Sequence, residues 1–133
     1  MRSLYQSSYG SPAVLKLFDT PKPAPRAGQV LIRVHAACLN SWDWDRLTGK
    51  PRTWRLLSGI LAPRHKVPGC DIAGVVEAVG PAVTRLKLGD AVMGDLSAAG
   101  LWGAFAEYTV APESILAVKH PGLSFEQAAC LPQ

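Results

Sequence analysis

The sequence predicts a mainly β fold, arranged as a small, partly open barrel with a few short helices. Its 133 residues are enough for one compact domain with a single core. The 12 glycines and 11 prolines fall between short apolar runs, a pattern typical of short strands joined by turns. The clearest strand is 30–36, where apolar residues alternate with polar ones and Arg33 and His35 lie opposite the apolar face.

Seven segments have the composition of strands, and turn residues separate them. These strands are residues 3–5, 14–18, 30–36, 71–79, 91–93, 104–110 and 115–118. The proline-rich run 21–25 excludes helix and predicts a stiff surface connector. Within 71–79, Gly74 predicts a point where another backbone or a bound molecule comes close, because glycine has no side chain to obstruct it.

Helical segments are few and short. They are residues 41–47, one turn at 54–58 inside an irregular loop, and a segment that begins at Ser124. Asn40 or Ser41 is the expected N-cap of the first helix, and Gly49 ends it. The last helix begins with a capping-box sequence, in which Ser124 and Gln127 each bond the other's backbone amide.

The positive charge of the chain is local. The net charge is +4, and six of the 14 Lys and Arg residues lie between Arg46 and Cys70, together with His65 and no acid. A solvated loop is the favoured interpretation of this segment, and a site for a phosphate-bearing substrate is the alternative. No recognised nucleic-acid motif accompanies the charge, so no nucleic-acid partner is expected.

Cysteine usage and hydropathy predict a location in the cytoplasm. The three cysteines, Cys38, Cys70 and Cys130, form no CxxC pair and give no sign of a disulfide framework. No apolar run approaches the roughly 18 residues that a transmembrane helix needs, and the first residues do not resemble an export signal. Neither membrane insertion nor export is therefore expected.

Six short motifs occur in an order and spacing that chance does not readily produce. They are Gly28-Gln29-Val30-Leu31-Ile32-Arg33-Val34, Ala36-Ala37-Cys38-Leu39-Asn40, Pro68-Gly69-Cys70-Asp71-Ile72-Ala73-Gly74-Val75-Val76, Gly89-Asp90-Ala91-Val92, Gly103-Ala104-Phe105-Ala106-Glu107-Tyr108 and Ser124-Phe125-Glu126-Gln127-Ala128-Ala129. Together they resemble the N-terminal, GroES-like catalytic domain of the medium-chain dehydrogenase/reductase superfamily, in its zinc-free, quinone-oxidoreductase-like branch. The resemblance covers essentially the whole chain.

The resemblance implies a GroES-like, partly open β-barrel at residues 1–123 as the catalytic and substrate domain. Residues 124–133 would begin the helix that leads to a Rossmann domain, which this sequence lacks because it contains no GxGxxG after a predicted strand. The chain is therefore expected to be a fragment or a truncated product, and to be inactive alone because the cofactor domain is missing.

The same resemblance implies an activity for the complete enzyme. It would reduce a carbonyl, quinone or α,β-unsaturated carbonyl compound by hydride transfer from NADPH or NADH, with NADPH favoured, and it would act as a homodimer. An enoyl-thioester reductase is the second interpretation, with the basic segment 46–66 contacting a carrier's phosphates. A non-catalytic GroES-like interaction module is the third.

No metal is expected at the site. Zinc-dependent members of the superfamily place a Cys at the position of Asn40, and a His followed by Glu at the positions of Cys70 and Asp71. Catalytic zinc requires three protein donors such as thiolate or imidazole, and a carboxamide replaces them poorly. The four-cysteine loop for structural zinc is also absent from the sequence.

Asn40 is the predicted catalytic and cofactor-binding residue. In zinc-free relatives the matching Asn lies beside the nicotinamide, where its amide orients the cofactor or polarises the substrate oxygen. A role as N-cap alone carries equal weight, and both roles are compatible. Several reductases of the family have a Tyr proton donor five residues later, where this sequence has Asp45. Asp45 can fill that role only if burial raises its pKa, because an ionised carboxylate has no proton to donate.

The predicted substrate-binding residues are Trp44, Trp54 and Asp71. Tryptophan rings form flat walls for apolar substrates, although packing in the core is the commoner role for them and for Trp42. The resemblance implies that Asp71 lies beside the family's cleft. The alternative is a purely structural role, in which Asp71 accepts hydrogen bonds or pairs with an Arg.

Overall fold

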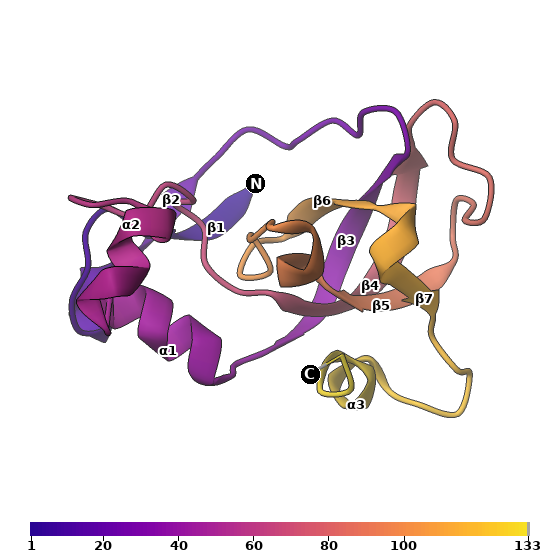
Figure 1. Cartoon of the computed structure of the whole chain (residues 1–133). Helices are drawn as coiled ribbons and strands as arrows, with labels where there is room; N and C mark the ends of the chain where they lie inside the picture. Colours follow the sequence, from indigo (N-terminus) through magenta and orange to yellow (C-terminus); the bar gives the residue numbers. More distant parts are fainter. Residues whose placement is uncertain (133) are drawn as a thin grey trace.

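The computed structural model describes residues 1–132, apart from the side chain of Leu57, and its main element is a five-stranded antiparallel sheet. The strands lie in the order β6-β3-β4-β5-β7, which leaves β6 and β7 as open edges. Their bounds are β3 Gln29–Cys38, β4 Asp71–Val79, β5 Ala91–Asp95, β6 Tyr108–Pro112 and β7 Leu116–Val118. A separate hairpin pairs β1 (Arg2–Gln6) with β2 (Leu15–Asp19), as Figure 1 shows. The predicted mainly β fold is confirmed.

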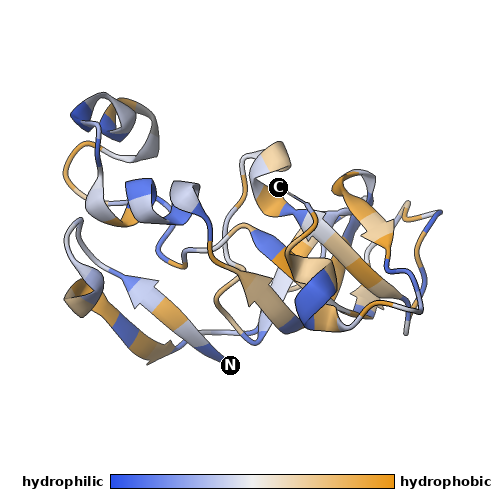
Figure 2. Cartoon of the chain, turned by 90° about the horizontal axis from the view of Figure 1, so that it is seen from below, coloured by the Kyte–Doolittle hydropathy of each residue, from blue (hydrophilic) through white to orange (hydrophobic). Residues whose placement is uncertain are grey.

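The core lies between the larger sheet and the loops that cross it. Hydrophobic residues line its strands (Figure 2). The largest buried cluster consists of Val30, Ile32, Ile72, Val76, Leu86, Val92, Leu96, Ala104, Ala111 and Leu116. Each fully buried aliphatic side chain of this size stabilises the fold by roughly 1.5 to 3 kcal/mol. The core therefore holds the ends of β3, β4 and β5 in fixed positions.

Strand β3 shows the predicted alternation. Ile32 is buried, whereas Arg33 and His35 are exposed. Leu31 is buried as well, beside a register shift between Leu31 and Ile32 where β3 pairs with β4. Such a bulge re-aims a side chain within the strand, so the simple period of two fails at this one place.

Gly74 lies where the backbone of β3 comes closest to β4. A Cβ atom built on Gly74 would lie 2.2 Å from the carbonyl oxygen of Arg33. The predicted close approach at Gly74 is therefore confirmed, and the neighbour is another strand.

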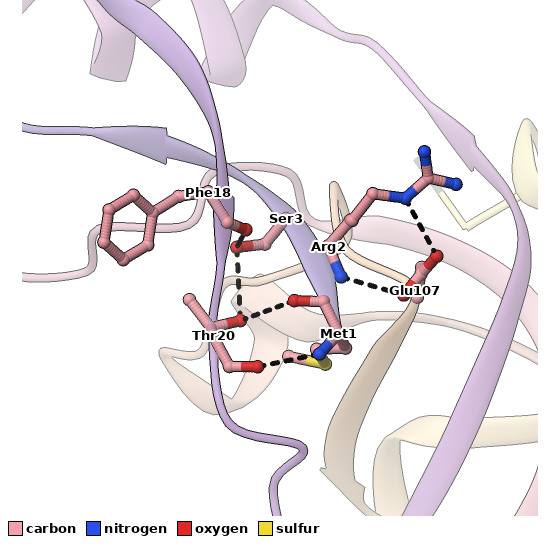
Figure 3. Close-up of polar contacts among 6 residues, drawn as sticks. All are labelled: Met1, Arg2, Ser3, Phe18, Thr20 and Glu107. Carbon is pink, nitrogen blue, oxygen red and sulfur yellow. Dashed lines mark hydrogen bonds and ion pairs between the residues drawn. The ribbon is translucent and has the colours of Figure 1, made fainter.

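The N-terminal hairpin is attached to the segment that precedes β6. The carboxylate of Glu107 accepts hydrogen bonds from the backbone N–H of Arg2 at 2.8 Å and from its Nε at 3.3 Å (Figure 3). The hydroxyls of Ser3 and Thr20 lie 3.3 Å apart and join the two ends of the hairpin. The backbone N–H of Leu4 also donates to the carbonyl of Phe105.

These contacts explain one wrong prediction. The strand predicted at 104–110 begins only at Tyr108. The backbone amides of Ala104 and Phe105 donate to the carbonyls of Gly69 and Pro68, which lie just before β4. The segment 104–107 is thus held by the loop before β4 and by the N-terminal hairpin, and it contacts β3 through the hydrogen bond from the backbone N–H of Val34 to the carbonyl of Glu107 at 2.9 Å.

The helices are short, as predicted. They are α1 Ser41–Thr48, α2 Arg55–Ser58 and α3 Phe125–Ala129, with 3-10 turns η1 Pro12–Val14, η2 Arg52–Trp54, η3 Leu96–Ala99 and η4 Glu113–Ile115. α1 and α2 lie beyond the end of the larger sheet, and α3 lies apart from them (Figure 1). Among the described residues, no helix has the length and apolar character needed to cross a membrane.

The predicted ends of two helices are confirmed. Gly49 ends α1 in the left-handed conformation, with φ 63°. At the start of α3, Gln127 N donates to Ser124 Oγ at 3.1 Å and Ser124 N donates to Gln127 Oε1 at 3.0 Å. This capping box fixes the direction of α3, whose Ala128 and Ala129 pack against Ala73 of β4.

Candidate active site

Four polar residues meet where three neighbouring strands end. Cys38, the last residue of β3, pairs with Asp71 at the start of β4, and Asp71 pairs with Asp95 at the end of β5. Asn40 follows β3, and Cys70 precedes Asp71. We call Asn40, Cys70, Asp71 and Asp95 the Asn40 cluster.

The side chain of Asn40 holds this cluster together. Its Nδ2 donates to Asp71 Oδ2 at 2.7 Å and to Cys70 Sγ at 3.2 Å. Its Oδ1 accepts from the backbone N–H of Trp42 at 2.9 Å, and its own backbone N–H donates to Asp43 Oδ2 at 3.1 Å. Asn40, rather than Ser41, is therefore the N-cap of α1, and its carboxamide also contacts the end of β4.

Asp71 is a buried carboxylate with an incomplete set of partners. Its residue is 2% exposed, and its Oδ1 has no hydrogen-bond partner among the described residues. Burial raises the pKa of Asp71, and the negative charge of Asp95 raises it further, whereas the hydrogen bond from Asn40 opposes both effects. Asp71 therefore retains a proton to higher pH than an ordinary aspartate.

Cys70 is a neutral thiol at physiological pH. It is fully buried, and burial raises its pKa to about 12 although the hydrogen bond from Asn40 lowers it. The charges of Asp71 and Asp95 act in the same direction as burial. A thiol with this pKa is a poor nucleophile, because nucleophilic attack requires the thiolate.

The cluster can be tested for its fit to a metal ion. One ligand atom each from Cys70, Asp71 and Asp95 lies within 4.8 Å of the others, which is close enough for shared coordination. However, Nδ2 of Asn40 donates to both Cys70 Sγ and Asp71 Oδ2, so an amide donor, and no metal ligand, stands at the position of Asn40. With a protonated thiol and a carboxamide in place, this donor set fits zinc poorly.

A cavity of about 350 Å³ lies beside the cluster, between α1, α2 and the segment that includes η3. Its walls are mostly aromatic and basic side chains. They are Trp42, Asp45, Arg46, Trp54, Ser58, His65, Ser97, Gly100 and Trp102. We call this space the tryptophan pocket.

Two contacts join the tryptophan pocket to the Asn40 cluster. Ser97, a wall residue, donates its hydroxyl to Asp95 Oδ2 at 2.8 Å. Trp42, another wall residue, donates its backbone N–H to Asn40. The walls of the pocket are therefore hydrogen-bonded to two residues of the cluster, Asp95 and Asn40.

The aromatic rings of the pocket have defined orientations. Trp42 and Trp54 meet edge to face, with ring centroids 5.0 Å apart. The guanidinium of Arg46 lies 3.8 Å from the ring centre of Trp102 on the opposite wall. These walls suit a small, flat and partly polar ligand.

The structure brings together some of the predicted site residues. Asn40 and Asp71 are in the cluster, and Asp45 and Trp54 line the pocket. Trp44 does not line it, and its side chain is 57% exposed, so its substrate-binding role stays a prediction without support from the pocket.

Sequence reasoning missed three contributors. Asp95 follows the Gly89-Asp90 turn by one strand length, so strand pairing with Asp71 was the signal that could have identified it. Arg46 was counted only as part of the basic loop, and Trp102 carried no local signal.

The fold and the site together define a GroES-like catalytic domain. Residues 26–122 match the alcohol dehydrogenase GroES-like domain family, so the chain belongs to this family. Its relatives and structural neighbours include quinone oxidoreductases and enone or enoyl reductases, which confirms the predicted quinone-oxidoreductase-like branch of the medium-chain dehydrogenase/reductase superfamily.

Two curated relatives align with 99% of the chain at 41% identity. They are a 2-methylene-furan-3-one reductase of Solanum lycopersicum and a chloroplastic NADPH-dependent alkenal/one oxidoreductase of Arabidopsis thaliana. A trans-enoyl reductase of Fusarium mangiferae is 39% identical over 84% of the chain. The solved quinone oxidoreductase of Coxiella burnetii superposes with a TM-score of 0.85 at 36% identity, covering 99% of this chain and 41% of that one. The chain spans 34% of the length of the first two relatives.

Proposed function

We propose that the complete protein reduces a small conjugated carbonyl compound, with NADPH as the reductant. The observation that carries this proposal is the tryptophan pocket, which adjoins the Asn40 cluster through Ser97 and Trp42. The names of the relatives, which act on a furanone, on alkenals and alkenones and on quinones, support conjugated carbonyls as the substrate class.

The residues of this chain bind, orient and protonate in the proposed reaction. NADPH supplies the hydride when it is bound by the complete enzyme. Asn40 keeps the role that the resemblance implies, orienting the cofactor or the substrate oxygen, and its hydrogen bonds to Asp71 and Trp42 hold its carboxamide at the end of β4.

Two carboxyl groups are candidates for the proton source. Asp45 lines the pocket at the position where several reductases of the family have a Tyr donor, and it can donate a proton only if it is protonated when the substrate is bound. Asp71 does not line the pocket, but burial raises its pKa, which favours a retained proton and makes it the second candidate.

The proposal is tested with the complete protein that contains this chain. We expect it to oxidise NADPH in the presence of an alkenone such as benzylideneacetone, with the product saturated at the former double bond. Loss of NADPH absorbance and mass analysis of the product measure the reaction. Turnover of simple alcohols with NADP⁺, and none of alkenones or quinones, would contradict it.

Residues 1–133 by themselves should bind NADPH only weakly. Most contacts to a dinucleotide come from strand–helix units with a phosphate-binding turn, and this sequence has no such glycine-rich motif. Calorimetric titration of the chain measures the Kd. A value in the low micromolar range would reveal a nucleotide site that this proposal does not include.

We also propose that the enzyme works without zinc. Purified protein should contain no stoichiometric zinc, because a carboxamide stands where a thiolate ligand would be needed and donates to both Cys70 and Asp71. Elemental analysis by mass spectrometry checks this expectation. One zinc per chain, whose removal lowers the melting temperature, would overturn it.

An enoyl-thioester reductase remains the second candidate. The fungal trans-enoyl reductase supports it, as do the exposed Arg64 and Lys50 near the pocket-bearing helices, which could meet the phosphates of a carrier. Reduction of crotonyl-CoA at least tenfold more efficiently than benzylideneacetone would favour it over the first candidate.

The wider organisation follows the family resemblance. We propose residues 1–123 as the substrate domain, 124–133 as the start of a helix leading to a Rossmann domain, and a homodimer as the assembled enzyme. We also propose a location in the cytoplasm. The chloroplast is the alternative, because two relatives are chloroplastic.

A further inference from the structure

We propose that Arg46 selects substrates that carry a carboxylate on their conjugated framework. This inference rests on the tryptophan pocket being the substrate site of the proposed function, and it goes further by naming the group that the substrate carries. The argument starts from the surroundings of Arg46.

The guanidinium of Arg46 is enclosed by the protein, and the carboxylate of Asp43 attracts it without an ion-pair contact. Neither of the two ion pairs found within residues 1–132 includes it. Its Nε is buried without an acceptor, and its Nη2 makes only a long contact of 3.4 Å to the carbonyl of His65. A charged group held in this way is costly to the fold unless something else compensates it.

The face of Trp102 compensates Arg46 only in part. The ring centre lies 3.8 Å from the guanidinium carbon, and this stacking fixes the plane of the guanidinium. It leaves the edge of the guanidinium, where the N–H groups point, to be satisfied by other acceptors. A carboxylate matches this planar edge with two parallel hydrogen bonds.

The positive charge on the pocket wall is that of Arg46. His65 lines the same pocket, but burial together with the charges of Arg46 and Arg64 lowers its pKa and favours the neutral imidazole. Asp45 is the one acidic residue among the pocket walls, and its carboxylate opposes an incoming anion. Arg46 and Asp45 are thus opposite charges on the wall of one pocket. Mutations at these two residues should therefore change the affinity for an anion in opposite directions.

The rest of the pocket fits the conjugated part of such a molecule. Trp42 and Trp54 form one aromatic corner, and Trp102 forms the opposite wall. A space of about 350 Å³ is at the small end of the roughly 300 to 1,000 Å³ typical of ligand pockets. An aryl enone with one carboxylate has the size and the shape for it.

Two probes of nearly equal shape test the inference on the 133-residue chain. They are benzylideneacetone with a para carboxylate and the same compound with a para carboxamide, which is neutral. Binding is followed by quenching of tryptophan fluorescence. The carboxylate should bind about tenfold more tightly than the carboxamide, and high salt should reduce the difference.

Variants separate the charge of Arg46 from its packing. Arg46→Gln should remove the preference for the carboxylate while changing the Kd of the carboxamide by less than about threefold. Arg46→Lys, which keeps the charge but loses the planar edge, should keep a reduced preference. Asp45→Asn should strengthen carboxylate binding about threefold, because it removes the opposing charge. Thermal unfolding of each variant verifies that it is folded.

Three results would overturn the inference: equal binding of the two probes by the unchanged chain, a full preference that survives in folded Arg46→Gln, or no binding of either probe. Equal binding, together with reduction of both probes by the complete enzyme, would leave the proposed function standing. No binding here, together with no reduction of benzylideneacetone by the complete enzyme, would contradict both.

Discussion

Replacing Asn40 by Asp is expected to lower the free energy of unfolding of the chain by about 2 to 4 kcal/mol at pH 7. An aspartate caps a helix as well as an asparagine, so α1 keeps its N-cap. The loss of stability comes from the amide nitrogen of Asn40, because this Nδ2 lies 2.7 Å from the buried Asp71 Oδ2. A carboxylate placed there meets another carboxylate, and the two cannot both be ionised without a large penalty.

The pH dependence of this variant has a definite sign. The pKa of Asp71 is already raised, and a second carboxylate beside it raises the pKa values of the pair further. A carboxyl group with a raised folded-state pKa costs stability as pH rises above its ordinary value, and protonation of one partner at lower pH restores a hydrogen bond. The deficit of Asn40→Asp should therefore shrink between pH 7 and pH 5, as measured by urea unfolding at each pH.

Asn40→Ala is the matched variant without the new charge. It removes the cap and the donor to Asp71, and we expect a loss of about 1 to 3 kcal/mol that depends less on pH than that of Asn40→Asp. Equal losses for both variants, with the same pH dependence, would contradict the close contact with Asp71.

The same two variants test catalysis in the complete enzyme. If Asn40 positions the cofactor or the substrate oxygen, Asn40→Ala should lower kcat/KM by about ten- to a thousandfold. The Asp variant lacks the amide donor and adds a negative charge, so it should be impaired as well. Near-normal turnover of folded Asn40→Asp would rule out the catalytic role, leaving only that of an N-cap.

Gly74→Ala is expected to destabilise the chain by about 3 kcal/mol or more. The new Cβ would lie 2.2 Å from the Arg33 carbonyl oxygen and 2.8 Å from a methyl group of Ile32. Backbone atoms of a paired strand cannot move aside singly, so β3 and β4 would have to separate. These strands position Asn40 and Asp71, and the site should be disturbed together with the fold.

Gly122→Ala is the control for this prediction. There the Cβ would approach only the ring of the exposed His120, at 3.2 Å, and a side chain can rotate away. We expect a change within about 0.5 kcal/mol. Chemical denaturation of the two variants measures both values, and similar losses in the two would contradict the account of Gly74.

The local pattern of the sequence was sufficient to predict the strands and helix ends near the site. The strand predicted at 71–79 has the bounds of β4, and Asn40 caps α1 as one of the two expected residues. The capping box at Ser124 and the end of α1 at Gly49 were also predicted, because these features depend on residues within one helical turn. The prediction of a strand at 104–110 failed because its first four residues bond mainly to the loop before β4 and to the N-terminal hairpin, which are distant in the sequence.

Only the tertiary structure determined which side chains share the site. The register of β3, β4 and β5 brings Asp95 to Asp71, and no local signal encodes a register. Folding of α1 toward the segment after η3 stacks Arg46 on Trp102, which lie 56 residues apart (102 − 46). It also leaves Trp44 exposed while Trp42 lines the pocket, because residues two apart on a helix do not face the same side. The sequence by itself therefore determined the fold family and the Asn40 cap, while long-range packing decided the composition of the pocket.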